Sequence, residues 1–175
     1  IKNLVIHGGG PQIKKKLEAQ NIQSKFILGL RVTDEKVIKI VEDVLLNDIN
    51  PDLVNTISSF NAIAEPVTAR NKNGILKVTK AKNPNLGFVA EPEEIDDEKL
   101  NSIINSNKVP VIAPMGLGEN NQVYNINADT AAGTIAIKIK AERLLLMTDV
   151  PGVKDKKGSY ISKLTILEAQ KLIDN

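Results

Sequence analysis

Short apolar runs alternate along this chain with stretches whose apolar residues recur every three or four positions. Residues 4–7, 109–113 and 144–147 are the apolar runs, and 34–45 and 96–105 carry the helical spacing. Because crossover helices join parallel strands, the alternation predicts an α/β fold, a three-layer αβα sandwich with a largely parallel central sheet. We see no repeat or linker, so we expect residues 1–175 to form a single domain.

The composition excludes several classes of function. A formal net charge of +2 gives no concentrated basic face, so we expect neither a nucleic-acid partner nor a membrane partner. The chain has no cysteine, and His7 is its one histidine, which rules out disulfides, thiolate sites and a histidine-rich metal site. No metal-ligand cluster is readable. The apolar runs are shorter than the roughly 20 residues that span a bilayer, so we expect a cytoplasmic or plastid location.

The two ends of the sequence suggest a piece of a longer protein. The chain begins with Ile1 just ahead of a predicted strand, and it stops at Asn175 within a helical pattern. We therefore expect a fragment that lacks both ends.

Three glycines follow the first apolar run. His7 precedes Gly8, Gly9 and Gly10, and Pro11 suits the first turn of a helix. Glycine has no Cβ, so the backbone N–H groups can approach an anion, and the helix start adds its positive end. The alternative is a strand–helix turn that needs glycine for its dihedral angles alone. Three consecutive glycines favour the anion site, whereas His7 by itself indicates a buried, hydrogen-bonded residue rather than a catalyst.

A second candidate is Arg31, which lies in a glycine-containing turn, GLRVTD at 29–34, just before a helical pattern. A guanidinium group can grip a carboxylate with two parallel hydrogen bonds. An arginine in a loop is more often simply solvated, so residue type alone does not decide between these interpretations.

The third candidate is the sequence NINAD at 125–129. Asn127 can cap the helix that follows, and Asp129 would lie in its first turn, where a negative charge is favourable. The functional alternative is that Asn125 binds a polar group of a substrate and Asp129 orients cationic side chains around a transferring phosphoryl group.

The fourth candidate is the loop 148–152, TDVPG, which follows the apolar run 144–147. We expect that run to be a buried strand, and ligands of open α/β sheets bind beyond the carboxyl ends of strands. A nucleotide could rest on this loop. The alternative is a plain turn that the Pro-Gly pair initiates.

In this order, the motifs resemble the amino acid kinase family and, within it, the acetylglutamate kinases. The resemblance covers essentially the whole chain, and GLRVTD after HGGG is its most discriminating pair. The segments that carry it are HGGGPQI (7–13), GLRVTD (29–34), VPVIAP (109–114), NINADTAA (125–132) and LLLMTDVPGV (144–153).

The resemblance implies roles in substrate binding for four residues. Gly9 and Gly10 would contact N-acetyl-L-glutamate and the transferring phosphoryl group. Arg31 would bind a substrate carboxylate, and Asn125 would bind the substrate as well.

It also implies a catalytic residue and a cofactor loop. Asp129 would organise the catalytic lysines, and Thr148, Asp149, Val150 and Gly152 would lie against the nucleotide. The implied cofactors are ATP and Mg²⁺.

The implied reaction is direct in-line transfer of the γ-phosphoryl group to the side-chain carboxylate, giving N-acetylglutamyl 5-phosphate in arginine biosynthesis. Such transfer depends on positioning and charge neutralisation. The resemblance also implies a homo-oligomer, a dimer or a hexamer.

The sequence departs from the family pattern in three places. The N-terminal strand with one charge-stabilising lysine and the C-terminal part with a second are absent, so we expect residues 1–175 alone to be nearly inactive. Residues 62–69 also lack the usual glycine-rich stretch.

Two other functions remain open at the level of sequence. One is a related carboxylate kinase, of the aminoadipate kinase type, whose substrate is linked to a carrier protein. The other is a non-catalytic module that binds an amino acid or nucleotide, because a fold does not fix a function.

Overall fold

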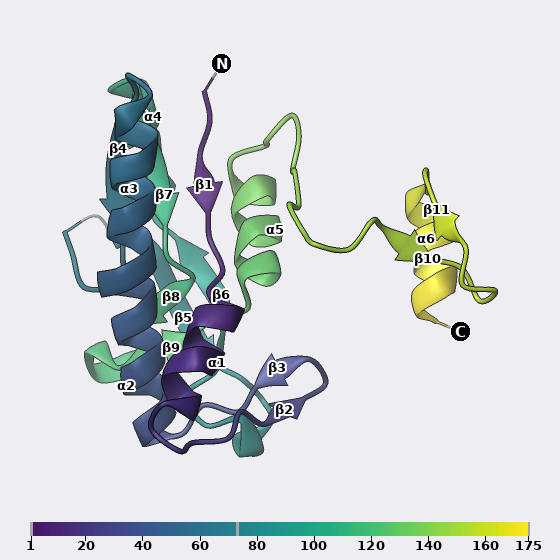
Figure 1. Ribbon diagram of the computed structural model, residues 1–175. Coiled ribbons are helices and arrows are strands. Elements are labelled where there is room, and N and C mark those ends of the chain that lie inside the picture. The colour runs from purple at the N-terminus through teal and green to yellow at the C-terminus, as the bar shows by residue number, and fades with distance from the viewer. Residues whose placement is uncertain (1, 73, 175) are drawn as a thin grey trace. The chain divides into compact units, whose positions relative to one another are not determined.

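The computed structural model describes residues 2–72 and 74–174 (Figure 1). The chain divides into two compact units, Ile1–Leu144 and Leu145–Asn175. Each unit is described here by itself.

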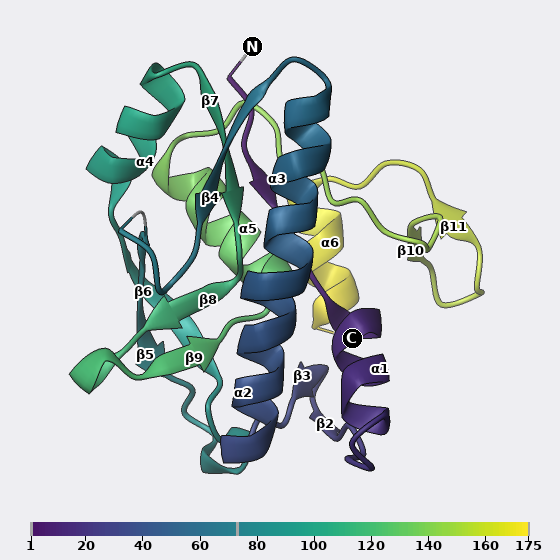
Figure 2. The ribbon, with the colours of Figure 1, turned by 60° about the vertical axis from the view of Figure 1, so that its left-hand side comes forward.

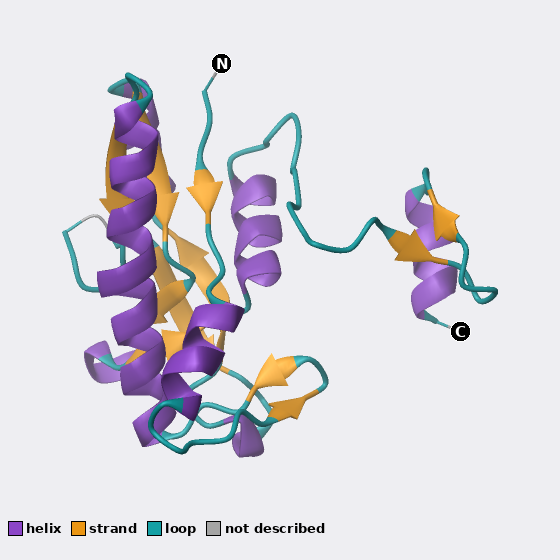
Figure 3. Ribbon diagram, in the orientation of Figure 1, coloured by secondary structure: helices purple, strands orange, loops and turns teal. Residues whose placement is uncertain are grey.

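A parallel three-stranded sheet lies at the centre of the first unit (Figure 3). Strand β7 (Lys108–Ile112) pairs in parallel with β1 (Val5–Ile6) on one side and with β4 (Ile63–Val67) on the other. The carboxyl ends of β1 and β7 therefore meet at the same edge, since Ile6 is in register with Ile112. The α/β class and the parallel sheet that the sequence predicts are confirmed.

The first unit also contains a second sheet, which has both parallel and antiparallel strands. Its strand order is β6-β5-β8-β9. Strand β5 (Leu76–Lys80) runs antiparallel to β6 (Ala90–Ile95) and parallel to β8 (Met115–Leu117), and β8 runs antiparallel to β9 (Val123–Asn125). A short 3₁₀ turn, η3 (Glu119–Asn121), joins β8 to β9. Alternation alone did not predict this sheet, because hairpin connections leave no helical pattern between strands.

Helices cover the parallel sheet on both sides. Figure 2 shows α3 (Asn50–Ser59) and α4 (Asp97–Asn105) on opposite sides of β4 and β7. Two separate apolar clusters result, one that includes α4 and α5 (Ala128–Lys138) and one that includes α1 (Gly10–Glu18) and α2 (Glu35–Asp43). Fully buried members are Val67, Leu100, Ile112 and Ile135 in the first cluster and Leu17, Val41, Leu45 and Met115 in the second.

One continuous helical rod joins α2 to α3 through a π-helical turn, η1 (Val44–Ile49). The backbone N–H of Asn50 donates to the carbonyl of Leu45, five residues back. Pro51 explains the wider turn, because proline has no N–H to donate and its ring would press on the carbonyl four residues earlier. A proline in the first turn is also typical of the start of a separate helix, but here the π turn lets the helix continue.

The second unit holds a small hairpin and a helix. Strands β10 (Val153–Lys154) and β11 (Tyr160–Ile161) pair antiparallel, and α6 (Ile166–Ile173) follows. Thr165 and Glu168 form a capping box at the start of α6. Residues 144–147 were expected as a buried strand, but they are exposed and form no strand. A strand needs a neighbour to bond its backbone, and no strand among the described residues pairs with this run.

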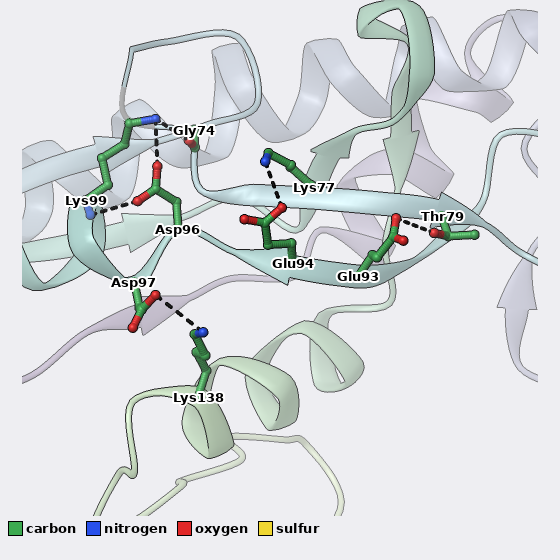
Figure 4. A network of polar contacts seen from close by, with 9 residues as sticks. All are labelled: Gly74, Lys77, Thr79, Glu93, Glu94, Asp96, Asp97, Lys99 and Lys138. Carbon is green, nitrogen blue, oxygen red and sulfur yellow. Dashed lines mark hydrogen bonds and ion pairs between the residues drawn. The ribbon is translucent and has the colours of Figure 1, made fainter.

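Charged side chains line the exposed side of β5 and β6 and continue to α4 and α5 (Figure 4). Lys77 pairs with Glu94 at 2.7 Å, and Asp97 pairs with Lys138 at 3.4 Å, which links the start of α4 to the end of α5. Asp96 caps α4, and its pKa is held below the usual range, first by the backbone N–H of Lys99. Exposed pairs like these contribute little to stability.

None of the helices in the described ranges combines the length and apolarity needed to cross a membrane.

Candidate functional site

The glycine turn between β1 and α1 is closely packed on one side and open on the other. A Cβ on Gly9 would lie 2.7 Å from side-chain atoms of both Leu45 and Ile49, so no larger residue fits there without displacement. A Cβ on Gly10 would meet nothing within 4 Å. A larger residue at position 9 would therefore require Leu45 and Ile49 to shift, whereas Gly10 borders open space.

The N–H groups of this turn are available to a ligand. In the described part of the chain, the backbone N–H groups of Gly8, Gly9 and Gly10 donate no hydrogen bond. Gly9 caps α1 without a side-chain bond, and Pro11 occupies the first turn. Free N–H groups at a helix start can bind an anion, so the structure leaves these groups open for the anion site that the sequence predicts.

His7, directly before the glycines, is buried and hydrogen-bonded. Its Nδ1 lies 3.0 Å from the carbonyl oxygen of Gly8, and its Nε2 lies 3.1 Å from Nδ2 of Asn50. Burial lowers the pKa of the His7 imidazole, so the ring is neutral near pH 7. This is the buried role that the sequence indicated.

Arg31 reaches the glycine turn from a tight hairpin. Strands β2 (Phe26–Ile27) and β3 (Leu30–Arg31) are joined by Leu28 and Gly29, whose φ angles of 49° and 79° give a type I′ turn. Nη2 of Arg31 donates to the carbonyl of Gly10 at 3.3 Å. The sequence placed these two residues 21 positions apart, and the fold brings them into contact.

Two further contacts hold the guanidinium of Arg31 in place. Nη1 donates to the hydroxyl of Ser24, and the guanidinium carbon lies 4.8 Å from the centre of the Phe26 ring. Burial lowers the pKa of Arg31 from its very high usual value, which leaves the group cationic. A preorganised cation of this kind is suited to binding a carboxylate.

Asn125 is tied to the same hairpin through Thr33. Nδ2 of Asn125 donates to the Thr33 hydroxyl at 3.5 Å, and that hydroxyl donates to the carbonyl of Arg31 at 2.8 Å. Thr33 is fully buried. One hydroxyl thus connects the two residues that the sequence assigned to substrate binding.

Gly87 is a residue that sequence reasoning missed. Leu86 ends a 3₁₀ turn, η2 (Pro84–Leu86), and Gly87 directly after it has a φ of +72°. A Cβ there would lie 2.3 Å from the carbonyl oxygen of Thr33. Only glycine allows this approach, and the one signal in the sequence is the glycine itself, because a glycine inside an apolar run often marks a close backbone approach.

The segment after Gly87 connects the hairpin to β9. The N–H of Phe88 donates to the Thr33 carbonyl at 2.6 Å, and the N–H of Asn125 donates to the Phe88 carbonyl at 2.9 Å. The spacing between Arg31 and Asn125 is therefore set by backbone hydrogen bonds.

The start of α5 lies beside the glycine turn. A Cβ on Gly8 would come within 4.0 Å of the Ala128 Cβ. The side chain of Asn127 accepts from the N–H of Thr130 at 3.0 Å, and Asp129 occupies the first turn of α5 with its side chain exposed. The capping role of Asn127 is confirmed, and two helix starts, α1 and α5, converge on one place.

A small cavity of about 80 Å³ opens between the hairpin and the start of α5. Leu30, Val89 and two alanines give the side of the hairpin and sheet an apolar lining that Glu91 interrupts, and α5 contributes an amide and a hydroxyl group. The lining residues are Leu30, Ala81, Val89, Ala90, Glu91, Asn127 and Thr130.

The candidate nucleotide loop lies in the second unit. Thr148, Asp149, Val150 and Gly152 form an exposed bend, in which the N–H of Val150 donates to the Thr148 hydroxyl at 3.4 Å. A cavity of about 430 Å³ lies between the hairpin and α6 of this unit, lined by Val153, Lys154, Asp155, Lys156, Leu164, Ala169, Leu172 and Ile173. Across the described residues, no group of three or more His, Cys, Asp or Glu side chains is arranged to hold a metal ion.

The sequence model described as "Amino acid kinase family" matches residues 1–175. The chain belongs to the amino acid kinase family. In this member of the family, the α/β architecture has a parallel sheet, and the glycine turn lies at the end of β1.

Relatives of the chain include proteins named acetylglutamate kinase. The protein of that name from Pelagibacter ubique HTCC1062 is 47% identical over 171 residues, which are 98% of this chain and 58% of the relative. The one from Gluconobacter oxydans 621H is 41% identical over 99% of this chain and 62% of its own length. The chain thus spans about three fifths of the length of these relatives.

Solved structures agree with the fold. The structure of smu.665 from Streptococcus mutans UA159 matches with a TM-score of 0.91 at 26% identity, over 99% of this chain and 70% of that one. The structure of N-acetylglutamate synthase from Neisseria gonorrhoeae, complexed with coenzyme A and L-arginine, matches with a TM-score of 0.69 at 22% identity, over 99% of this chain and 42% of that one. The second likeness shows the fold alone.

Proposed function

We propose that the protein containing this chain transfers the γ-phosphoryl group of ATP to the side-chain carboxylate of N-acetyl-L-glutamate, giving N-acetylglutamyl 5-phosphate for arginine biosynthesis. The observation that carries the proposal is the contact of the Arg31 guanidinium with the Gly10 carbonyl at 3.3 Å. The contact brings the cation that we propose to bind a carboxylate next to the start of α1, which we propose to bind the phosphoryl group. Relatives named acetylglutamate kinase, at 41–47% identity, support this substrate.

The substrate would be held at two of its polar groups. The guanidinium of Arg31 is proposed to bind the α-carboxylate, with the amide of Asn125 as a second polar partner. The apolar part of the 80 Å³ cavity beside Leu30 and Val89 would accept the methyl of the acetyl group. Plain glutamate would leave that space unfilled and place an ammonium group next to it.

The transferring phosphoryl group would be stabilised by the glycine turn. The N–H groups of Gly9 and Gly10 and the positive end of α1 would bind its oxygens, where negative charge accumulates during transfer. Asp129 is proposed to orient cationic side chains around the same group. Such transfer requires positioning more than covalent help, which fits a site without an activated nucleophile among its proposed members.

ATP is proposed to bind against the loop 148–152. We propose that residues 1–175 comprise the acetylglutamate-binding half and the start of the ATP-binding half, with Thr148, Asp149, Val150 and Gly152 against the nucleotide. Mg²⁺ usually enters such sites on the phosphates and keeps several waters, so we propose it as part of MgATP.

The remaining proposals concern the whole protein. We propose a homo-oligomer, a dimer or a hexamer, located in the cytoplasm.

The test is calorimetric binding and a coupled kinase assay on the full-length gene product. Saturable binding of N-acetyl-L-glutamate, weak binding of glutamate, and loss of binding in Arg31→Ala are expected. The kinase assay is repeated with carrier-linked aminoadipate, the substrate of the alternative function. Turnover of that substrate without turnover of acetylglutamate would refute the proposal, as would nucleotide binding without any phosphoryl transfer.

A further inference from the structure

A buried chain of hydrogen bonds runs from β7 to the glycine turn. Nδ2 of Asn50 donates to the carbonyl of Val111 at 2.9 Å and lies 3.1 Å from Nε2 of His7. Nδ1 of His7 lies 3.0 Å from the carbonyl oxygen of Gly8. Asn50 is 1% exposed and His7 is 6% exposed, so water does not compete for these groups.

The order of donors and acceptors determines which nitrogen of His7 carries the proton. A carbonyl only accepts, so the Asn50 group facing Val111 must be the NH₂. An amide NH₂ only donates, so Nε2 of His7 must accept and carries no proton. The remaining ring proton is then on Nδ1, which donates to the Gly8 carbonyl. His7 is therefore a neutral ring in one defined tautomer.

The fixed Gly8 carbonyl in turn orients the next N–H group. No peptide bond among the described residues is cis, and in a trans peptide the carbonyl of one residue and the N–H of the next point in opposite directions. Because the Gly8 carbonyl faces His7, the Gly9 N–H faces away from it. That N–H donates to no group in the described residues.

The π turn η1 positions both Asn50 and the side chains that pack against Gly9. Leu45 and Ile49 of η1 lie against the Gly9 position, and Asn50 follows η1 directly. Oδ1 of Asn50 is buried and has no hydrogen-bond partner in the described part of the chain. An unsatisfied buried acceptor is costly, so the amide contributes something other than its own stability.

We propose that Asn50 and His7 are positioning residues that aim the Gly9 N–H at the transferring phosphoryl group. Asn50 selects the ring tautomer, His7 fixes the Gly8 carbonyl, and the shared peptide plane sets the direction of the Gly9 N–H. The inference rests on the proposed function, since it names the residues that prepare that site. Neither side chain touches the substrate.

The first test is the tautomer of His7, measured by ¹⁵N NMR of the ring nitrogens in the full-length protein at pH 7.5. The His7 signals are those lost in His7→Asn. A neutral ring protonated at Nδ1 is expected. A ring protonated at Nε2, or at both nitrogens, would overturn the proposal.

The second test compares His7→Asn with His7→Leu in the kinase assay. The amide nitrogen of asparagine lies near the position of Nδ1 and can still donate to Gly8, whereas leucine keeps only the bulk. We expect kcat within about threefold of wild type in His7→Asn and a loss of about 100-fold in His7→Leu. KM for both substrates should change by less than about threefold, because ground-state binding does not use this group.

Circular dichroism of both variants checks the fold. Equal losses of kcat in the two variants would overturn the proposal, because the hydrogen bond to Gly8 would then not be what matters. A wild-type protein that does not phosphorylate acetylglutamate would refute the proposed function instead, and the tautomer measurement would still decide this inference.

Discussion

The side-chain amide of Asn125 donates to the hydroxyl of Thr33 across 3.5 Å, and the same hydroxyl donates to the carbonyl of Arg31. Thr33 lies fully buried between the two residues proposed to hold the substrate. The two residues are joined through a single oxygen atom, and neither could shift without affecting the other.

Replacing Thr33 by valine should therefore damage binding more than folding. Thr33→Val keeps the shape but removes the hydroxyl, at a cost in unfolding free energy of about 1–2 kcal/mol. KM for acetylglutamate should rise about tenfold, because the Asn125 amide loses its partner. Steady-state kinetics and urea unfolding measure the two effects. Thr33→Ser is the control, and a serine variant as impaired as the valine variant would contradict the role of the hydroxyl.

Gly9 and Gly10 should respond differently to alanine. Gly9→Ala places a methyl group 2.7 Å from Leu45 and Ile49, and overpacking of this kind costs about 1–3 kcal/mol. Gly10→Ala meets nothing within 4 Å and should leave the unfolding free energy unchanged or slightly higher, while it lowers kcat/KM by intruding on the ligand. Thermal unfolding and kinetics of both variants provide the comparison. If Gly10→Ala retains full activity, the open side of the turn does not bind the substrate.

Gly87→Ala should be among the most damaging single substitutions at a glycine. The residue has a φ of +72°, and the added Cβ would lie 2.3 Å from the backbone oxygen of Thr33. Strain and clash together should cost about 3 kcal/mol or more. Gly158→Ala is the matched control, because its φ is +84° but nothing lies within 4 Å. Urea unfolding should show a much smaller loss for the control, and similar losses would mean that the Thr33 contact is unimportant.

Arg31→Lys tests whether the guanidinium geometry matters rather than the charge. Lysine keeps a cation but cannot contact Ser24, Gly10 and a carboxylate with one planar group. We expect KM for acetylglutamate to rise about ten- to 100-fold with a smaller change in KM for ATP. Arg70→Lys, at an arginine paired with Glu42, is the control and should stay within twofold. An unchanged KM in Arg31→Lys would show that charge alone suffices.

His7 should make stability depend on pH in a defined direction. Its pKa is below the ordinary value of 6.5 in the folded chain, so the unfolded chain binds more protons as the pH falls below about 6.5. Stability is therefore full at neutral pH and declines on acidification until the folded ring also protonates. The slope for one proton is at most about 1.4 kcal/mol per pH unit.

The measurement is urea unfolding between pH 7.5 and 5.5, compared with His7→Asn, which cannot titrate. Carboxylates contribute equally to both proteins, so the difference isolates His7. Identical slopes in the two proteins would show that the ring is not held neutral by the fold.

Local patterns in the sequence were sufficient for the elements and their ends. The helical spacing of 34–45 and the Asn127 cap both appear in the structure. In each case the interacting residues lie within about one helical turn of each other. Both partners can therefore be recognised from a short stretch of sequence. The glycine turn was visible for the same reason, because a strand, three glycines and a helix start are consecutive.

Failures occurred where an element depends on a distant partner. Residues 144–147 have the composition of a buried strand but remain exposed, since no strand in the described residues pairs with them. The π turn before Asn50 likewise has no signal beyond Pro51, which predicts a break as readily as a widened turn.

By itself the sequence determined the α/β class, the glycine turn and the residue types that its chemistry requires. Only the tertiary structure decided that Arg31 reaches Gly10, that Gly87 passes against Thr33, and that Asn50 selects the tautomer of His7. These pairs are 21, 54 and 43 positions apart. Helix periods and caps are set by neighbouring residues, whereas contacts of this kind exist only after helices and strands have packed and brought distant backbone into hydrogen-bonding distance.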